Sequence, residues 1–102
     1  MEIKKPYYAV IFSNLRTEGD NGYPEMADAM EKLARTQKGF LGFESARDGF
    51  GIAISYWESL DDIAKWKANT AHLKAQENGR SQWYSWYKVR ICKVEREYSF
   101  EK

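Results

Sequence analysis

The 102-residue chain is long enough to bury one hydrophobic core but too short to divide into two, so we predict a single domain over residues 1–102. Its 16 basic and 15 acidic residues leave a formal net charge of +1, which argues against a nucleic acid or an anionic membrane as a partner. No apolar run approaches the roughly 20 residues that cross a bilayer, and the single cysteine, Cys92, cannot form an internal disulfide. These features favour a cytoplasmic protein.

The first part of the chain predicts a strand followed by a helix. Residues 7–16 alternate and are rich in β-branched and aromatic side chains, and both faces of this strand are largely apolar. Pro24 suits the first turn of a helix that runs to about Lys38, where Gly39 is expected to be its C-terminal cap.

A hairpin and a second helix follow. Residues 40–47 and 50–58 are predicted strands joined by Asp48-Gly49, a two-residue hairpin signal. Ser59 is then expected to cap a single helix that runs to Asn78, along which apolar residues recur at helical spacing.

The last part of the chain predicts a short turn or loop over residues 80–86 and a long strand over residues 86–100. The apolar positions of this strand change phase between Ile91 and Cys92, which predicts a bulge or a change in the surface it packs on.

The order of these elements is typical of an α+β, ferredoxin-like split βαβ fold, with a four-stranded antiparallel sheet and helices on one face only. Because the other face is also apolar, it needs a partner. We expect a homodimer whose sheets pack face to face, with the overlong C-terminal strand crossing onto the neighbour.

Polar and aromatic side chains gather on one face of the predicted second helix. Trp66, Asn69, His72, Leu73 and Gln76 fall within an arc of about 120° when they are plotted at 100° per residue. They can therefore line one wall of a site. Asn14, on an otherwise apolar strand face, must find a hydrogen-bond partner or water.

Three groups of residues resemble the antibiotic biosynthesis monooxygenase (ABM) superfamily. They are residues 39–44 (GFLGFE), residues 56–59 (YWES), and Trp66-Lys67 with His72 six residues after the tryptophan. A small bacterial subgroup is resembled by further residues, namely Gly79-Arg80, Trp83-Tyr84, Tyr87, Arg90 and Glu95-Arg96. The resemblance covers nearly the whole chain. It implies a dimeric α/β barrel with a pocket between sheet and helices in each subunit.

The same resemblance implies an activity. Some members of the family oxygenate polycyclic phenols without metal or flavin, so we expect a cofactor-independent monooxygenase acting with O2 on a small or polycyclic phenol or quinol. In such a reaction His72 would take a proton, and Asn or Arg would stabilise the phenolate or a peroxide. The expected catalytic residues are His72, Asn14 and Trp66. The expected substrate-binding residues are Trp57, Asn69, Gln76, Arg47, Tyr87 and Arg90.

Two other functions stay open. A sister branch degrades heme, and Asn14 and Trp66 match two of its positions, but Gln76 stands where that branch has the histidine that ligates iron. A non-enzymatic dimer that binds a small aromatic ligand is the third hypothesis. No His/Cys set points to a metal site.

Each candidate also has a purely structural interpretation. His72 suits a surface position bonded to a neighbour, and Trp66 suits the core. Arg47 and Arg90 suit ion pairs with Glu44, Glu95 or another acid on a strand. The aromatic cluster from Trp83 to Tyr87 is expected at a pocket rim or dimer seam.

Overall fold

A computed structural model describes residues 6–102, apart from the side chain of Thr70. Four strands form one antiparallel sheet in the order β2-β3-β1-β4. The strands are β1 (Tyr7–Arg16), β2 (Phe40–Asp48), β3 (Phe50–Trp57) and β4 (Tyr84–Val94). The helices are α1 (Tyr23–Ala34), α2 (Leu60–Ala68) and α3 (Thr70–Asn78), and a π-helical turn, Gly79–Trp83, leads into β4. The predicted ferredoxin-like fold is confirmed. Within the described residues, no helix has the length and apolar character needed to span a membrane.

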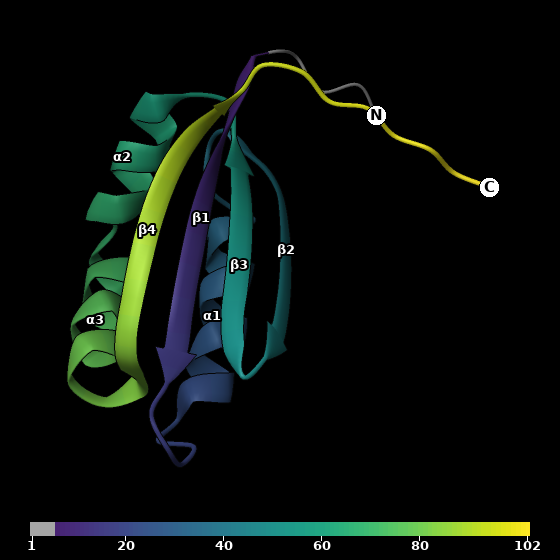
Figure 1. Cartoon of the computed structure of the whole chain (residues 1–102). Coiled ribbons are helices and arrows are strands. Elements are labelled where there is room, and N and C mark those ends of the chain that lie inside the picture. Colours follow the sequence, from purple (N-terminus) through teal and green to yellow (C-terminus); the bar gives the residue numbers. More distant parts are fainter. Residues whose placement is uncertain (1–5) are drawn as a thin grey trace.

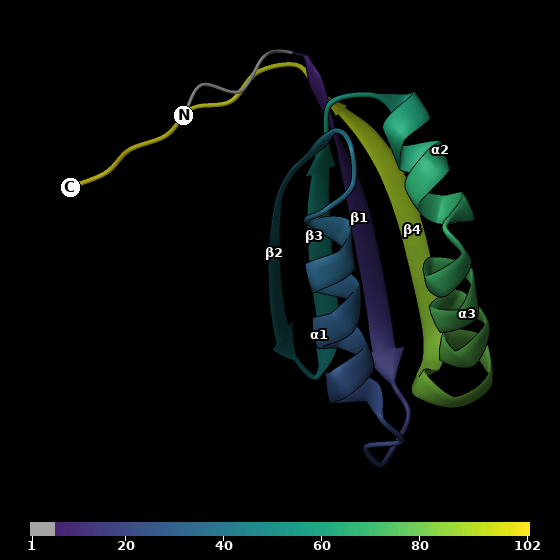
Figure 2. The same ribbon diagram turned by 180° about the vertical axis from the view of Figure 1, so that it is seen from behind.

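All three helices lie on one side of the sheet (Figures 1 and 2). Trp57 of β3 stacks on Trp66 of α2, so Trp57 points toward the helices. Tyr8 is paired with Trp57, and therefore the even-numbered residues of β1 point the same way, because directly paired residues share a face. We call this the helix side. The odd-numbered residues of β1, with their partners on β3 and β4, form the open side.

The core of the helix side is centred on Trp57, which is 0% exposed. Its ring packs edge-on against Phe40, and its indole nitrogen donates to the Ser55 hydroxyl at 2.9 Å. A buried indole N–H without a partner would cost stability, so Ser55 makes this position suitable for tryptophan.

The first helix ends earlier than its sequence predicts. It stops at Ala34 rather than near Lys38, and Gly39 is not its cap. Gly39 has a φ of 83°, and a Cβ there would collide with the side chain of Asp62. The glycine is therefore needed for the close approach of this loop to the start of α2.

The predicted second helix is two helices. At Asn69 the backbone leaves the helical region, with φ −57° and ψ 130°, and the Asn69 side chain accepts from the backbone N–H groups of Ala71 and His72. Asparagine is a favoured N-terminal cap because its side chain satisfies N–H groups that lack a partner in the first turn. The expectation of one continuous helix is wrong for this reason.

The last strand ends at Val94, not at Phe100. Residues 95–102 carry no regular structure and extend away from the sheet (Figure 1). β4 pairs with β1 without a register shift from Val94 to Trp86, so there is no bulge at the change of phase after Ile91. The change of phase arises because apolar residues of β4 lie on both sides of the sheet. The register shifts only further along, where Arg16 pairs with Tyr84 and Leu15 with Trp86.

Candidate functional site

Three aromatic rings form a stack on the helix side. The ring centres of Trp57 and Trp66 are 6.0 Å apart, and those of Trp66 and His72 are 4.2 Å apart with planes only 13° from parallel. The stack joins the end of β3 to α2 and α3. The helix is interrupted at Asn69, which caps α3. For this reason the His72 ring folds back over Trp66 instead of projecting one turn further along the same helix.

The His72 ring is held in one orientation. Its Nδ1 lies 3.0 Å from the backbone oxygen of Trp66. A carbonyl oxygen only accepts, so Nδ1 carries the hydrogen and the neutral ring keeps its lone pair on Nε2. Burial lowers the pKa of His72 below its ordinary value of 6.5, against the opposing effect of the hydrogen bond to Trp66. His72 is therefore uncharged at neutral pH, as a proton acceptor must be.

Two predicted substrate contacts, Asn69 and Gln76, are engaged elsewhere. The Asn69 side chain caps α3. The Gln76 amide nitrogen donates to the backbone oxygen of Lys67 at 3.2 Å and lies 3.4 Å from His72 Nδ1. Both residues fix the junction of α2 and α3. The heme alternative stays a prediction, but its iron-ligand position is occupied by an amide already bonded to the backbone.

A second group, the arginine–tyrosine cluster, lies at the other end of the helix side. It consists of Asn14, Arg16, Tyr23, Arg47 and Tyr84. Asn14 is 2% exposed, and its Oδ1 accepts from Arg47 Nη2 at 2.5 Å. Arg47 Nη2 also lies 3.5 Å from the Tyr23 hydroxyl. The requirement that Asn14 find a partner is met by Arg47.

Tyr23 is the centre of this cluster. The Arg16 guanidinium lies 3.7 Å above its ring, and the Tyr84 ring packs edge-on at 5.7 Å. Burial, followed by its hydrogen bond with Tyr23, raises the pKa of Tyr84 far above its ordinary value, so this phenol stays neutral. Sequence reasoning missed Tyr23 and Arg16. The only local signal was an aromatic residue next to Pro24 at the start of α1.

A partly exposed apolar surface lies between the aromatic stack and the arginine–tyrosine cluster. Val89 and Ile91 point to the helix side, through their pairing with Phe12 and Val10, yet they remain 48% and 51% exposed. These four residues, which we call the strip, occupy the rows between the Tyr8–Trp57 pair and Asn14. Phe12 also touches the rings of Tyr84 and Tyr87. An apolar floor with polar groups at its ends is typical of a ligand site.

Arg90 does not belong to this surface. It pairs with Ile11 and so projects from the open side, which corrects the expectation that it lines a site with His72. The anticipated ion pairs of Arg47 and Arg90 with Glu44 are also not formed. Arg47 points to the helix side and Glu44 to the open side, and Arg90 lies on the edge strand opposite to that of Glu44. The Glu44 carboxylate instead accepts from the Tyr56 hydroxyl at 2.5 Å. That hydrogen bond raises the pKa of Tyr56 to about 12.

The cluster from Trp83 to Tyr87 is divided between the two sides. Trp83 is buried and donates its indole N–H to the Asn21 oxygen at 2.7 Å. Tyr87 faces the helix side, where its hydroxyl accepts from Arg80 at 3.3 Å. Trp86 faces the open side and stacks on Phe50.

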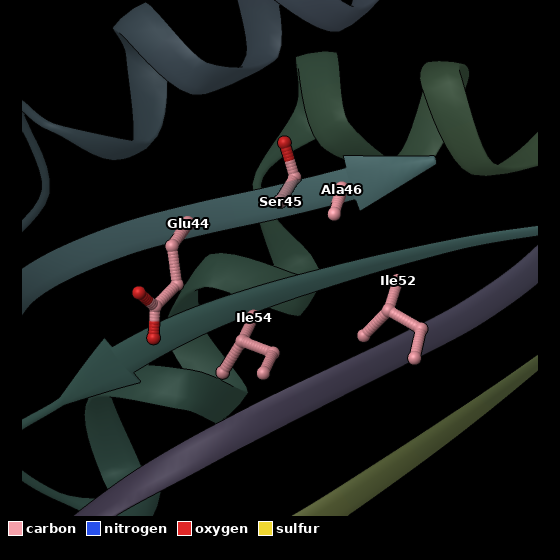
Figure 3. A pocket seen from close by; sticks show the side chains of 5 residues that line it. All are labelled: Glu44, Ser45, Ala46, Ile52 and Ile54. Atoms are coloured by element: carbon pink, nitrogen blue, oxygen red, sulfur yellow. The ribbon is translucent and has the colours of Figure 1, made fainter. Parts of the chain in front are cut away.

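The open side contains a shallow pocket of about 310 Å³. Figure 3 shows its lining side chains on neighbouring strands: Glu44, Ser45, Ala46, Ile52 and Ile54. Apart from Glu44 it offers little to orient a polar ligand. Phe50, Ile52, Leu15 and Trp86 add exposed apolar surface to this side.

Comparison with known proteins agrees with this fold. Residues 6–78 match the antibiotic biosynthesis monooxygenase family. The chain is 52% identical to YqjZ, an uncharacterized protein of Bacillus subtilis, over 99 residues that span 95% of this chain and 87% of that protein.

Two solved structures share the architecture at low sequence identity. Rv0793 from Mycobacterium tuberculosis matches with a TM-score of 0.80 and 14% identity, over 91% of this chain and 99% of that one. SnoaB, a cofactor-independent oxygenase from Streptomyces nogalater, matches with a TM-score of 0.78 and 12% identity, over 89% and 95%. Likeness at this level of identity shows the fold alone.

Proposed function

Because the chain belongs to the antibiotic biosynthesis monooxygenase family, we propose that it is a cofactor-independent monooxygenase that oxidises a phenol- or quinol-type aromatic molecule with O2. The observation that carries the proposal is His72: a neutral imidazole, held by Trp66, with Nε2 as its proton acceptor, on the same side of the sheet as the strip. The family relationship and the fold of the oxygenase SnoaB support it.

The proposed reaction requires a base and a flat apolar surface, both supplied by the protein. His72 takes a proton from the substrate, which makes the ring electron-rich enough to reduce dioxygen. When a phenol is oxidised to a quinone, one ring C–H becomes a carbonyl and the phenol hydroxyl becomes the second carbonyl. One oxygen atom of O2 enters the product and the other leaves as water, so the phenol supplies all four electrons. Trp66 and the strip hold the ring, and Asn14 and Arg47 stabilise negative charge at the far end.

Oxygen consumption tests this proposal directly. Purified protein is mixed with a panel of quinols and polyphenols, and the rate is compared with those of His72→Ala and of Lys74→Gln, an exposed change on the same helix. Loss of a positioned base is expected to slow turnover by about 100-fold or more, whereas Lys74→Gln keeps the wild-type rate. If no compound is oxidised, or if His72→Ala is as fast as wild type, the chain is not this kind of oxygenase.

We also propose that the chain works as a homodimer whose open sides pack together. Support comes from the exposed apolar residues of that side, Leu15, Phe50, Ile52 and Trp86, because a contiguous apolar patch on a sheet marks an interface. The tail after Val94 carries Tyr98 and Phe100 almost fully exposed. We propose that it lies along the second copy, as the sequence led us to expect of the final strand.

A further inference from the structure

Arg47, Gly51 and Asn14 stand side by side across three strands. Register places Gly51 of β3 between Arg47 of β2 and Asn14 of β1. Since Arg47 donates to Asn14, its guanidinium extends over the position where a β3 side chain would be. A Cβ on Gly51 would lie only 2.5 Å from the guanidinium carbon. The missing side chain is what allows Arg47 to occupy this place.

The charge of Arg47 is not neutralised by an acid within residues 6–102. The ion pairs found there belong to Lys32, Arg35 and Lys65. The protein groups that Arg47 does meet, Asn14 and the Tyr23 hydroxyl, are neutral, and both are bonded by the same nitrogen, Nη2. A guanidinium has five N–H donors, so donors on its other nitrogens remain for a ligand. The nearly fully buried Asn14 amide holds it in position.

This arginine adjoins the strip. Asn14 is paired with Tyr87, and the next helix-side row along the same strands is Phe12 with Val89. An aromatic ring lying on the strip therefore places a substituent of one edge beside Asn14 and Arg47. A planar guanidinium fork matches the two oxygens of a carboxylate, with which it forms short, charge-assisted hydrogen bonds.

We propose that Arg47, oriented by Asn14 and given room by Gly51, binds the carboxylate of an aromatic acid whose ring lies on the strip. The inference rests on the proposed function, since the ring on the strip is the ring to be oxidised, and it narrows the substrate class to aromatic carboxylates. Gly51 is a positioning residue, because it acts only through the place it leaves for Arg47.

Two ligands that differ in one charge test the inference. Isothermal titration calorimetry of the full chain compares 3-hydroxy-2-naphthoate with 3-hydroxy-2-naphthamide. Wild type is expected to bind the naphthoate about tenfold more tightly than the naphthamide, because one charge-assisted hydrogen bond contributes about this much. Gly51→Ala keeps every charge but displaces the guanidinium, and Arg47→Gln removes the charge, so both abolish the preference. Arg35→Gln, which removes an exposed charge from the end of α1, retains it.

Three results would overturn the inference: equal affinity of wild type for both ligands, no detectable binding of the naphthoate, or a preference that survives in Gly51→Ala and Arg47→Gln. Thermal unfolding checks that Gly51→Ala is folded, which is expected because the atoms its Cβ meets belong to the end of a flexible side chain. If the preference holds while no phenol in the panel drives oxygen consumption, the anion site stands and the proposed oxidation fails.

Discussion

The two sides of one sheet use their residues differently. On the helix side, polar groups are paired with each other: Asn14 with Arg47, the Trp57 indole with Ser55, and His72 with a backbone oxygen. On the open side, large apolar side chains such as Phe50 and Trp86 are exposed. The helix side thus holds the fully buried Trp57 and the groups capable of chemistry. On the open side Tyr7 and Ala9 are buried, but the exposed apolar residues are suited to burial against another surface.

The largest expected effect tests where the core lies. Trp57→Ala removes a side chain that is 0% exposed, and should lower the free energy of unfolding by about 3–5 kcal/mol. Trp86→Ala, on the open side and 46% exposed, should cost the monomer about 1 kcal/mol or less. Urea unfolding at low protein concentration measures both. Equal losses would mean that the two sides contribute alike to the core.

The next effect tests the open side as an interface. Phe50→Glu places a charge on the proposed dimer surface and should raise the dimer dissociation constant by about 100-fold or more, because the carboxylate would be buried without a partner. Leu73→Glu is a matched control: both residues are 49% exposed, but Leu73 lies on α3. Sedimentation velocity over a concentration series measures the difference. A wild type that stays monomeric throughout would contradict the proposal.

Sequence reasoning found the strands, the hairpin and their order because each depends on local alternation and turn residues. It also placed Trp66 and His72 together, although the stack arises from a helix break and not from shared helical phase. The row of Arg47, Gly51 and Asn14 was not predicted. A two-residue turn at Asp48-Gly49 would pair Arg47 with Phe50, whereas the structure pairs Asp48 with Phe50 and therefore Arg47 with Gly51. The pairing of Gly51 with Asn14 depends on contacts distant in sequence.

The side of the sheet that Arg90 occupies was also not predictable. Alternation places Arg90 on the face opposite to Tyr87. Because both phases of the last strand contain apolar residues, it could not show which of the two faces the helices cover. Asn69, by contrast, carried a readable signal. An asparagine inside a helical pattern competes for backbone N–H groups and favours a cap, which is the role the structure gives it.

The next prediction, with a smaller effect, tests whether α2 and α3 on the helix side are separate helices. Asn69→Ala removes the cap of α3 and is expected to lower the free energy of unfolding by about 1 kcal/mol. The backbone amides of α3 should then exchange hydrogen faster, whereas those of α1 should not. Ser59→Ala removes the side chain that accepts from the Asp62 N–H and should loosen α2 instead. If Asn69→Ala and Ser59→Ala change the same amides, α2 and α3 behave as one helix despite the break.

The smallest effect concerns the protonation of His72. Burial lowers its pKa in the folded chain, so between that pKa and the ordinary value of 6.5 the unfolded chain binds more protons than the folded one. The free energy of unfolding should therefore fall as the pH drops below about 6.5, and His72→Gln should weaken this dependence.

His72 is the only histidine, so its ring signal in an NMR titration is unambiguous. Its midpoint should lie below 6.5 and rise in Trp66→Ala, which uncovers the ring that the helix side shields. A midpoint at or above the ordinary value would remove the neutral base from the helix side, and with it the chemical difference between the two sides of the sheet.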